Sequence, residues 1–182
     1  IEPCCPMKND ETTDGELMRR VQTGDRGAFA SLIERHQEYV RKVAFRMVRR
    51  WDVADDLAQE TFLRVYRAAA SYKPTAAFST WLYQLVLNLC RDWYRSQQLR
   101  FHHSLNHEEL PDRASSPGIE QEELGEAVRQ AVSALPERQQ EVVILHRYMG
   151  LSHRQIAEIV DKSESAVESY LVRAYANLRK AL

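Results

Sequence analysis

Helical periodicity in nearly every long segment is the feature that most constrains how this chain can fold. Apolar residues recur at three- and four-residue steps between Phe29 and Met47, and again between Ala58 and Ala69. That spacing places them along one face of an amphipathic helix, and no segment alternates convincingly in the way a half-buried strand does. The sequence therefore predicts an all-α protein.

Two breaks in this periodicity indicate how the chain is divided. Pro74 interrupts the pattern within "SYKPTAA", and a later segment of 25 residues loses it while gathering prolines, a glycine and serines, a composition typical of a linker. We expect two helical domains joined by a flexible linker. The predicted parts are a disordered extension or non-native remnant (1–15), a larger bundle (16–98), an acidic linker (99–123) and a smaller bundle (124–182).

Charges of opposite sign are concentrated in different segments, although the net charge is only −1. Residues 32–50 contain six basic and two acidic residues, whereas residues 107–126 contain seven acidic residues and one arginine. Such patterning suits more than one kind of partner. The acidic composition of the linker favours a solvated tether, which reaches roughly 80 Å when extended.

Cysteine usage and hydropathy bear on the compartment. Cys4, Cys5 and Cys90 form neither a disulfide framework nor a pair of zinc knuckles. No segment resembles a signal peptide or approaches the ~20 apolar residues that span a bilayer. We expect a cytoplasmic protein without membrane insertion, metal or cofactor. Cys90 is expected in the core, and no function is assigned to the cysteines near the N-terminus.

The sharpest local motif is "LSHRQIAEIVDKSESAVESYLVRAYANLRKAL", residues 151–182. Ser152 and Gln155 have the spacing of a capping box at the start of a helix. "DKSE" predicts a tight turn, and a second helix follows with Ser163 or Ser165 as its cap. Two short helices joined in this way form a helix-turn-helix, whose second helix enters the major groove of DNA.

The second helix of this motif has an inward stripe and an outward polar face. With Val167 and Leu171 facing inward, Arg173 can be bidentate to guanine and Glu168 can accept from cytosine. A plain helical hairpin with a solvated face is the alternative, but the turn length, the caps and a small residue at the helix crossing favour DNA binding. The outward set is Ser165, Glu168, Ser169, Val172 and Arg173.

A second motif, "FSTWLYQLVLNLCRDWYRSQQ" (78–98), interleaves aromatic residues with Arg91 and Arg95. A dry core explains the aromatics but not the arginines. Single-stranded nucleic acid explains both, because bases stack on aromatic rings while arginines follow the phosphates. Taken alone, the motif leaves core packing and nucleic-acid binding open.

Several motifs in order resemble one family. "DVADDLAQETFLRVYRA", "FSTWLYQLVLNLCRDWYRS" and "ALPERQQEVVILHRYMGLSHRQIAEIV", followed by the helix-turn-helix, closely resemble the extracytoplasmic-function (ECF) sigma factors of bacterial RNA polymerase. The resemblance runs from about Glu16 to Leu182. The matching residues are Asp56, Gln59, Glu60 and Phe62 in the first block, Phe78, Trp81, Leu82, Asn88 and Arg95 in the second, and Leu135, Pro136 and Arg138 in the third.

The resemblance implies an alternative sigma factor whose partners are core RNA polymerase, promoter DNA and an anti-sigma factor. Sigma region 2 (16–98) would clamp the β′ coiled coil and melt the minus-ten element, and region 4 (124–182) would read the minus-35 element and touch the β flap. It implies no catalytic residues, because the polymerase performs the chemistry. The implied polymerase-binding residues are Asp55, Asp56, Gln59 and Glu60.

The same resemblance implies a pocket for a flipped minus-ten base. Tyr72 and Lys73 match the wall of the loop, Asn88 matches the polar group on the following helix, and Arg91 and Arg95 would face the opening DNA. The outward set of the helix-turn-helix would read the minus-35 element. The "SYKPTAA" loop departs from the family pattern and leaves the preferred minus-ten base open, whereas an acid at position 168 implies a different minus-35 preference.

Other functions are compatible with parts of the sequence. A helix-turn-helix regulator acting without polymerase would explain residues 124–182 but would leave the two earlier motifs without a role. A metalloenzyme would have to use Cys90, His102, His103 and His107, which fall mostly in a linker-like stretch. An anti-sigma protein of the zinc type would need a His-x-x-x-Cys-x-x-Cys pattern, which the sequence lacks.

Overall fold

The structure is a computed structural model that describes residues 13–73, 77–103 and 119–182. Helices account for almost all of these residues, and no strand occurs among them, which confirms the predicted all-α class. The helices are α1 (Asp14–Gln22), α2 (Arg26–Val48), α3 (Trp51–Ala68), α4 (Phe78–His103), α5 (Ile119–Ser133), α6 (Glu137–Val143), α7 (His153–Val160) and α8 (Glu164–Ala181). A short 3₁₀ turn, η1 (Ala69–Ser71), follows α3, and a π-helical turn, η2 (Ile144–Tyr148), follows α6.

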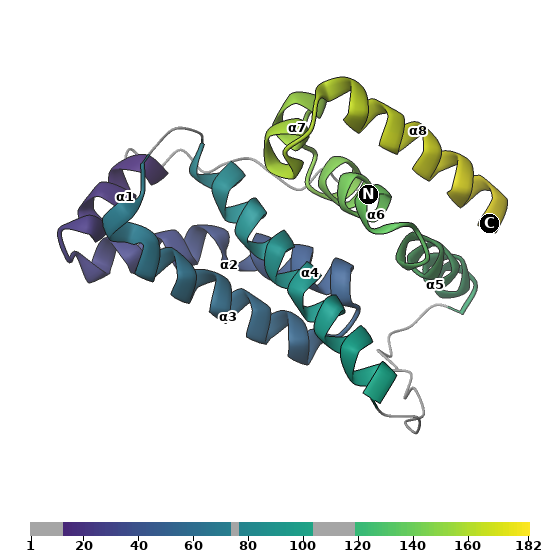
Figure 1. Cartoon of the computed structure of the whole chain (residues 1–182), viewed down its shortest axis with the longest axis horizontal. Coiled ribbons are helices and arrows are strands. Elements are labelled where there is room, and N and C mark those ends of the chain that lie inside the picture. The colour runs from purple at the N-terminus through teal and green to yellow at the C-terminus, as the bar shows by residue number, and fades with distance from the viewer. Residues whose placement is uncertain (1–12, 74–76, 104–118) are drawn as a thin grey trace.

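The N-terminal domain is a bundle of α1 to α4 (Figure 1). The side chain of Thr13 caps α1, and that of Asp25 caps α2 by accepting from the amide of Ala28 at 3.0 Å. Helix α2 ends where Arg49 adopts a left-handed conformation with φ of 61°. The predicted apolar stripes of α2 and α3 face the core, together with the inner face of α4.

The C-terminal domain places α8 across α5, α6 and α7. Ser152 and Gln155 form the predicted capping box of α7, and Ser163 rather than Ser165 caps α8 by accepting from the amide of Ala166 at 3.2 Å. The chain turns between α7 and α8 at Asp161, whose φ is 54°. The predicted helix-turn-helix is therefore present.

The helical regions extend beyond the expected domain boundaries. Helix α4 continues to His103 and α5 begins at Ile119, although loss of periodicity placed the linker at residues 99–123. A periodic apolar pattern requires a covered face, so a helix that projects beyond its bundle gives no such signal. The remainder of the predicted linker, residues 104–118, lies outside the described residues, as do residues 1–12.

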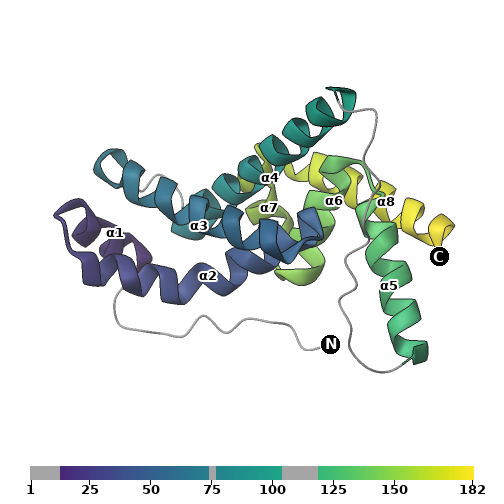
Figure 2. The same ribbon diagram turned by 90° about the horizontal axis from the view of Figure 1, so that it is seen from below.

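The two domains are in contact rather than separate. Helix α7 lies against α4 (Figures 1 and 2). The turn η2 lies against α2. The buried apolar side chains of both domains form one continuous cluster. Within the described ranges, no helix combines the length and apolarity needed to cross a membrane.

Candidate polymerase and promoter interface

The acidic face of α3 is the first surface that the sequence motifs predict. Asp56 and Gln59 are exposed, whereas Phe62 is buried. Asp55 forms a two-pronged ion pair with Arg41 of α2, in which Arg41 Nη2 lies 3.2 Å from Asp55 Oδ2. The hydrogen bond from Arg41 keeps the pKa of Asp55 below its usual value, so this carboxylate stays charged.

Glu60 completes this face but is paired within its own helix. Its carboxylate accepts from Arg64 at 3.0 Å and lies 4.0 Å from Arg67. Asp56 and Gln59 are therefore more accessible to a partner than the two flanking acids.

An apolar groove beside this face was not predicted from the sequence. It lies between α2 and α3, has a volume of about 790 Å³, and is lined in part by Phe29, Ile33 and Leu63. Leu63 is 49% exposed, and Tyr66, which packs on Phe29, is 48% exposed. Leu63 does not belong to the inward stripe of α3. An apolar residue outside that stripe is the sequence signal that could have indicated this groove.

The predicted minus-ten residues of the loop lie between α1 and α4. Tyr72 is partly buried, and its ring packs on Trp81 with the centroids 5.0 Å apart. Lys73 is exposed. Gln22 of α1, which the sequence did not single out, donates from Nε2 to the carbonyls of Ala69 and Tyr72, both at 3.0 Å. Gln22 thereby positions the loop wall; residues 74–76 lie outside the described residues.

The predicted residues of α4 divide into two accessible side chains and one covered one. Asn88 and Arg95 are exposed. Arg91 is only 13% exposed, because its Nε donates to Glu141 of α6 at 2.6 Å. Its Nη1 donates to Asn88 Oδ1 at 2.6 Å. The expectation that Arg91 faces DNA is therefore not met while the two domains are in this arrangement.

The rest of the aromatic helix serves the core, as the alternative explanation of this motif required. Tyr83, Leu89 and Cys90 are buried, and the hydroxyl of Tyr94 donates to the carbonyl of Met47. Burial raises the pKa of the Cys90 thiol to about 12, so it remains protonated and unreactive. Core packing and a polar outward face thus coexist on the same helix.

The outward face of α8 has the accessibility that a reader of DNA needs. Val167, Leu171 and Ala174 are buried, and Leu178 is half-buried. The five predicted outward residues are all exposed, and Val172 is 65% exposed. An apolar side chain beside Glu168 and Arg173 can contact a thymine methyl in the major groove.

The described residues give little support to the metalloenzyme alternative. No group of three or more histidine, cysteine or acidic side chains in the described part of the chain is arranged to hold a metal ion. The side chains of His102 and His103, and the whole of His107, lie outside that part. Cys90 is enclosed in the core.

Family comparisons match both domains. Residues 32–100 match the model of sigma-70 region 2, and residues 125–178 match that of sigma-70 region 4. The chain is 30% identical to the RNA polymerase sigma-H factor of Pseudomonas aeruginosa, with 93% of each chain covered. It is 32% identical to the ECF RNA polymerase sigma-E factor of Haemophilus influenzae, with 91% of this chain and 93% of the relative covered. The sigma-E factor of Escherichia coli K12 is also 32% identical.

Solved structures share the fold. CnrH, in complex with the cytosolic domain of CnrY, matches with a TM-score of 0.66 at 24% identity over 92% of this chain and 95% of CnrH. The sigma factor RpoE of Bartonella quintana, in complex with the anti-sigma factor NepR, matches with a TM-score of 0.67 at 20% identity over 84% of this chain and 95% of RpoE. Because two sigma-70 regions match in order and curated relatives match along more than nine-tenths of the chain, the protein belongs to the ECF sigma factors of the sigma-70 family.

Proposed function

We propose that this chain binds core RNA polymerase through α3, reads minus-35 DNA with α8, and melts the minus-ten element with α4 and the loop before it. The observation that carries this proposal is that the two matched sigma-70 regions fold as domains whose predicted contact faces are separate and largely exposed. The acidic face of α3 suits a basic protein partner, and the polar face of α8 suits base edges.

The proposed polymerase contact combines Asp56 and Gln59 with Asp55, Glu60 and the adjacent apolar groove. An interface with an apolar centre and a charged rim has the composition of a specific protein contact. We assign this surface to the β′ coiled coil and assign contact with the β flap to the C-terminal domain. The protein itself catalyses no reaction, and it acts in the cytoplasm, where polymerase and promoter meet.

The proposed minus-ten contact uses Tyr72 and Lys73 on the loop and Asn88, Arg91 and Arg95 on α4. Flipping a base out of the stack costs a few kcal/mol, which hydrogen bonds and aromatic contact in a pocket can offset. The ring of Tyr72 is held by Trp81, and its backbone is held by Gln22. A wall fixed in this way loses little entropy when a base enters.

We also propose regulation by an anti-sigma factor. Of the two solved neighbours, RpoE is bound to the anti-sigma factor NepR, and CnrH is bound to the cytosolic domain of CnrY. A protein that covers the α3 face or the helix-turn-helix of this chain would prevent transcription without affecting its fold.

Run-off transcription with bacterial core polymerase tests the proposed function directly. Core polymerase alone should yield no promoter-specific transcript from a library of bacterial upstream regions, whereas polymerase with this protein should yield a defined set. A helix-turn-helix regulator that acts without polymerase binding would bind duplex DNA but would neither co-purify with core polymerase nor start transcripts. DNA binding without polymerase binding or transcription would contradict the proposal and support a helix-turn-helix regulator instead.

Asn88→Ala should reduce open-complex formation roughly fivefold, because one hydrogen bond of about 1 kcal/mol to the opening strand is lost. Binding to core polymerase and to minus-35 duplex should not change, since Asn88 lies on neither surface. Asn177→Ala, the same substitution near the end of α8, is the matched control. Permanganate footprinting measures strand opening, and a premelted minus-ten bubble should recover only the melting part of the defect. If the Asn88→Ala variant opens the promoter strands normally, the Asn88 amide has a structural role and does not contact DNA.

A further inference from the structure

Three aromatic rings form a cluster at the proposed minus-ten loop, which carries Tyr72 and Lys73. The ring of Tyr72 lies 5.0 Å from that of Trp81 and 6.3 Å from that of Phe78. The centroids of Phe78 and Trp81 are 5.9 Å apart. Phe78 is buried at the start of α4, whereas the other two rings are partly buried. Tilted and edge-to-face contacts of this kind favour defined ring positions, so the position of Phe78 affects both of its neighbours.

A buried histidine packs on the inner side of this cluster. His36 of α2 is 7% exposed, and its imidazole lies 5.3 Å from the ring of Phe78. The Nε2 atom of His36 lies 2.8 Å from Asp14 Oδ2. A buried imidazole without a hydrogen-bond partner is unfavourable. The carboxylate of Asp14 therefore holds the His36 ring in its place against Phe78.

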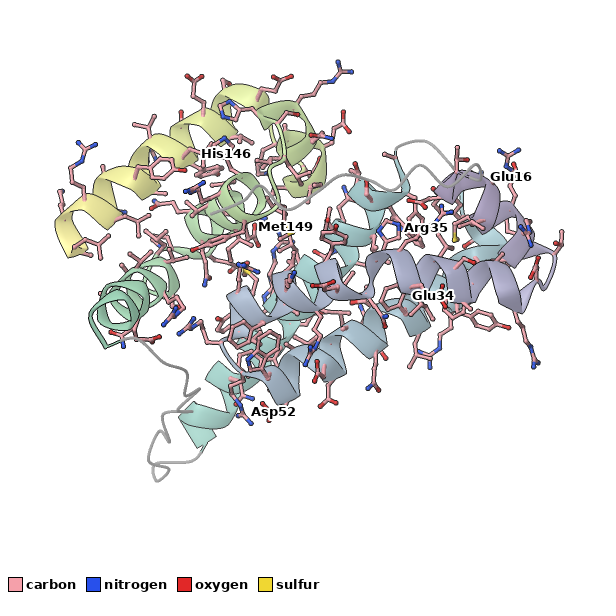
Figure 3. The ribbon with its side chains drawn as sticks, turned by 180° about the vertical axis from the view of Figure 1, so that it is seen from behind. Glu16, Glu34, Arg35, Asp52, His146 and Met149 are labelled. Atoms are coloured by element: carbon pink, nitrogen blue, oxygen red, sulfur yellow. The ribbon has the colours of Figure 1, made fainter. Side chains whose placement is uncertain are left out.

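Asp14, the first residue of α1, is negatively charged in the folded protein. Its Oδ1 accepts from Arg35 Nη1 at 3.2 Å, and Figure 3 shows Arg35 at the end of the bundle where α1 lies. Burial alone would raise the pKa of Asp14, but hydrogen bonds from His36 and Arg35 outweigh burial and keep the pKa below its usual value. Because an ionised carboxylate can only accept, His36 is the donor, and a bond to a charged acceptor is a strong one.

Helix α1 also holds the loop at its other end. Gln22, its last residue, donates to the carbonyls of Ala69 and Tyr72, and α1 lies against η1 (Figure 1). Burial and the negative charge of Asp14 together raise the pKa of the Tyr72 hydroxyl. The hydroxyl therefore stays protonated and can donate to an acceptor on a base.

We propose that Asp14 and His36 are positioning residues for minus-ten recognition: they hold the three aromatic rings in place so that the ring of Tyr72 can receive a flipped base. Neither residue contacts the base. The inference rests on the proposed function, because it supplies the support for the proposed pocket. Asp14 precedes residue 32, where the match to sigma-70 region 2 begins, so part of this support lies outside the matched residues.

Hydrogen–deuterium exchange of the full chain tests this support without polymerase or DNA. His36→Leu fills a similar volume but removes the hydrogen bond to Asp14, and it should speed exchange in peptides that contain Tyr72 and Phe78 roughly 10-fold. Peptides from α8 should exchange as in the wild type. His36→Gln keeps a nitrogen donor at a similar reach and should restore slow exchange. If exchange in the folded His36→Leu protein is unchanged, the proposal is wrong.

A second variant covers the case in which His36→Leu does not fold. Asp14→Ala removes the same hydrogen bond from a partly exposed position, and it should speed exchange in the same peptides by a similar factor. Glu16→Ala, two residues later in α1, is the matched control, because Glu16 pairs with Arg19 of its own helix. If the loop peptides of Asp14→Ala exchange no faster than those of Glu16→Ala, Asp14 does not position the loop.

Selection from a pool of single strands randomised across the minus-ten element, bound by polymerase holoenzyme, separates this inference from the proposed function. Asp14→Ala and His36→Leu should lower the preference for the best base over the worst at the most selective position roughly fivefold, because the pocket is less ordered. Affinity for core polymerase should not change, and Glu16→Ala should select as the wild type does.

The outcomes of this selection distinguish the two proposals. If the wild type selects a base and the two variants select it equally well, the positioning role is overturned while the proposed function stands. If the wild type selects no base at any position, the proposed minus-ten function fails, and Asp14 and His36 have no recognition to support. Faster loop exchange together with a weakened base preference would confirm the inference, because a residue that merely stabilised the fold would leave the base preference unchanged.

Discussion

Asp56→Arg combined with Gln59→Ala should weaken binding to core polymerase roughly 100-fold or more and abolish promoter-specific transcription. The α3 face is acidic and surface-exposed, so its partner surface is expected to be basic. A like-charge contact in an interface costs several kcal/mol, and the lost amide contact adds to that. Both positions are exposed, so the isolated protein should keep its helicity and its thermal stability.

A charge-matched control distinguishes a specific surface from a general electrostatic effect. Glu16→Arg makes the same reversal in α1, and Figure 3 shows Glu16 at the opposite end of the bundle from Asp52, one turn before Asp56. Affinity for polymerase, measured by titration of labelled protein with core enzyme, should not change for Glu16→Arg. If both variants lose affinity equally, or if the α3 variant keeps its affinity, this face is not the polymerase-binding surface.

Local sequence patterns predicted the helix-turn-helix closely because they depend on neighbouring residues. The capping box of Ser152 and Gln155 fixes the start of α7, and burial of Val167 and Leu171 determines which side of α8 faces outward. The choice between Ser163 and Ser165 was open because both offer the same hydroxyl. It is settled by where the helix begins, at Glu164.

The domain contact could not be predicted from the same patterns. Periodicity shows which face of a helix is covered, but not which other element covers it. A glutamate at position 141 indicates a surface position, since isolated charges are almost never buried. Its burial depends on Arg91, which lies 50 residues earlier in the chain. The position of Arg91 beside Glu141 is a tertiary property that neither residue shows in its local sequence.

The polar contacts that hold the proposed minus-ten loop show a similar limit of sequence-based prediction. Tyr72 is identifiable from the sequence because it lies in the loop before the second motif. Gln22 is not identifiable in this way. Gln22 contacts that loop across 47 and 50 residues of sequence, and a glutamine at the end of a short helix has no distinctive pattern. Residues proposed to contact DNA are easier to identify from the sequence than the residues that hold them in place.

Arg173→Ala should weaken binding of the full chain to its preferred minus-35 duplex by about 1–3 kcal/mol, which is roughly 5- to 150-fold, and should relax selectivity at one base pair. Arg173 is exposed on α8, three turns after its N-cap, and one bidentate contact to guanine accounts for an effect of this size. The carboxylate of Glu168 is not attracted to the DNA phosphates. Glu168→Ala should therefore relax selectivity at a different base pair while leaving non-specific affinity unchanged or higher.

Arg179→Ala and Lys180→Ala serve as controls, because both residues are exposed in the last turn of α8. We expect them to contact phosphates or solvent, so removing either should weaken binding to all duplexes alike and flatten the salt dependence. Selection from a randomised duplex pool at one fixed salt concentration measures the preferred sequence for each variant. Because base contacts change sequence preference whereas phosphate contacts change only affinity, a uniform loss of affinity in Arg173→Ala, with the preferred sequence unchanged, would place Arg173 on the backbone and leave α8 without its principal reader.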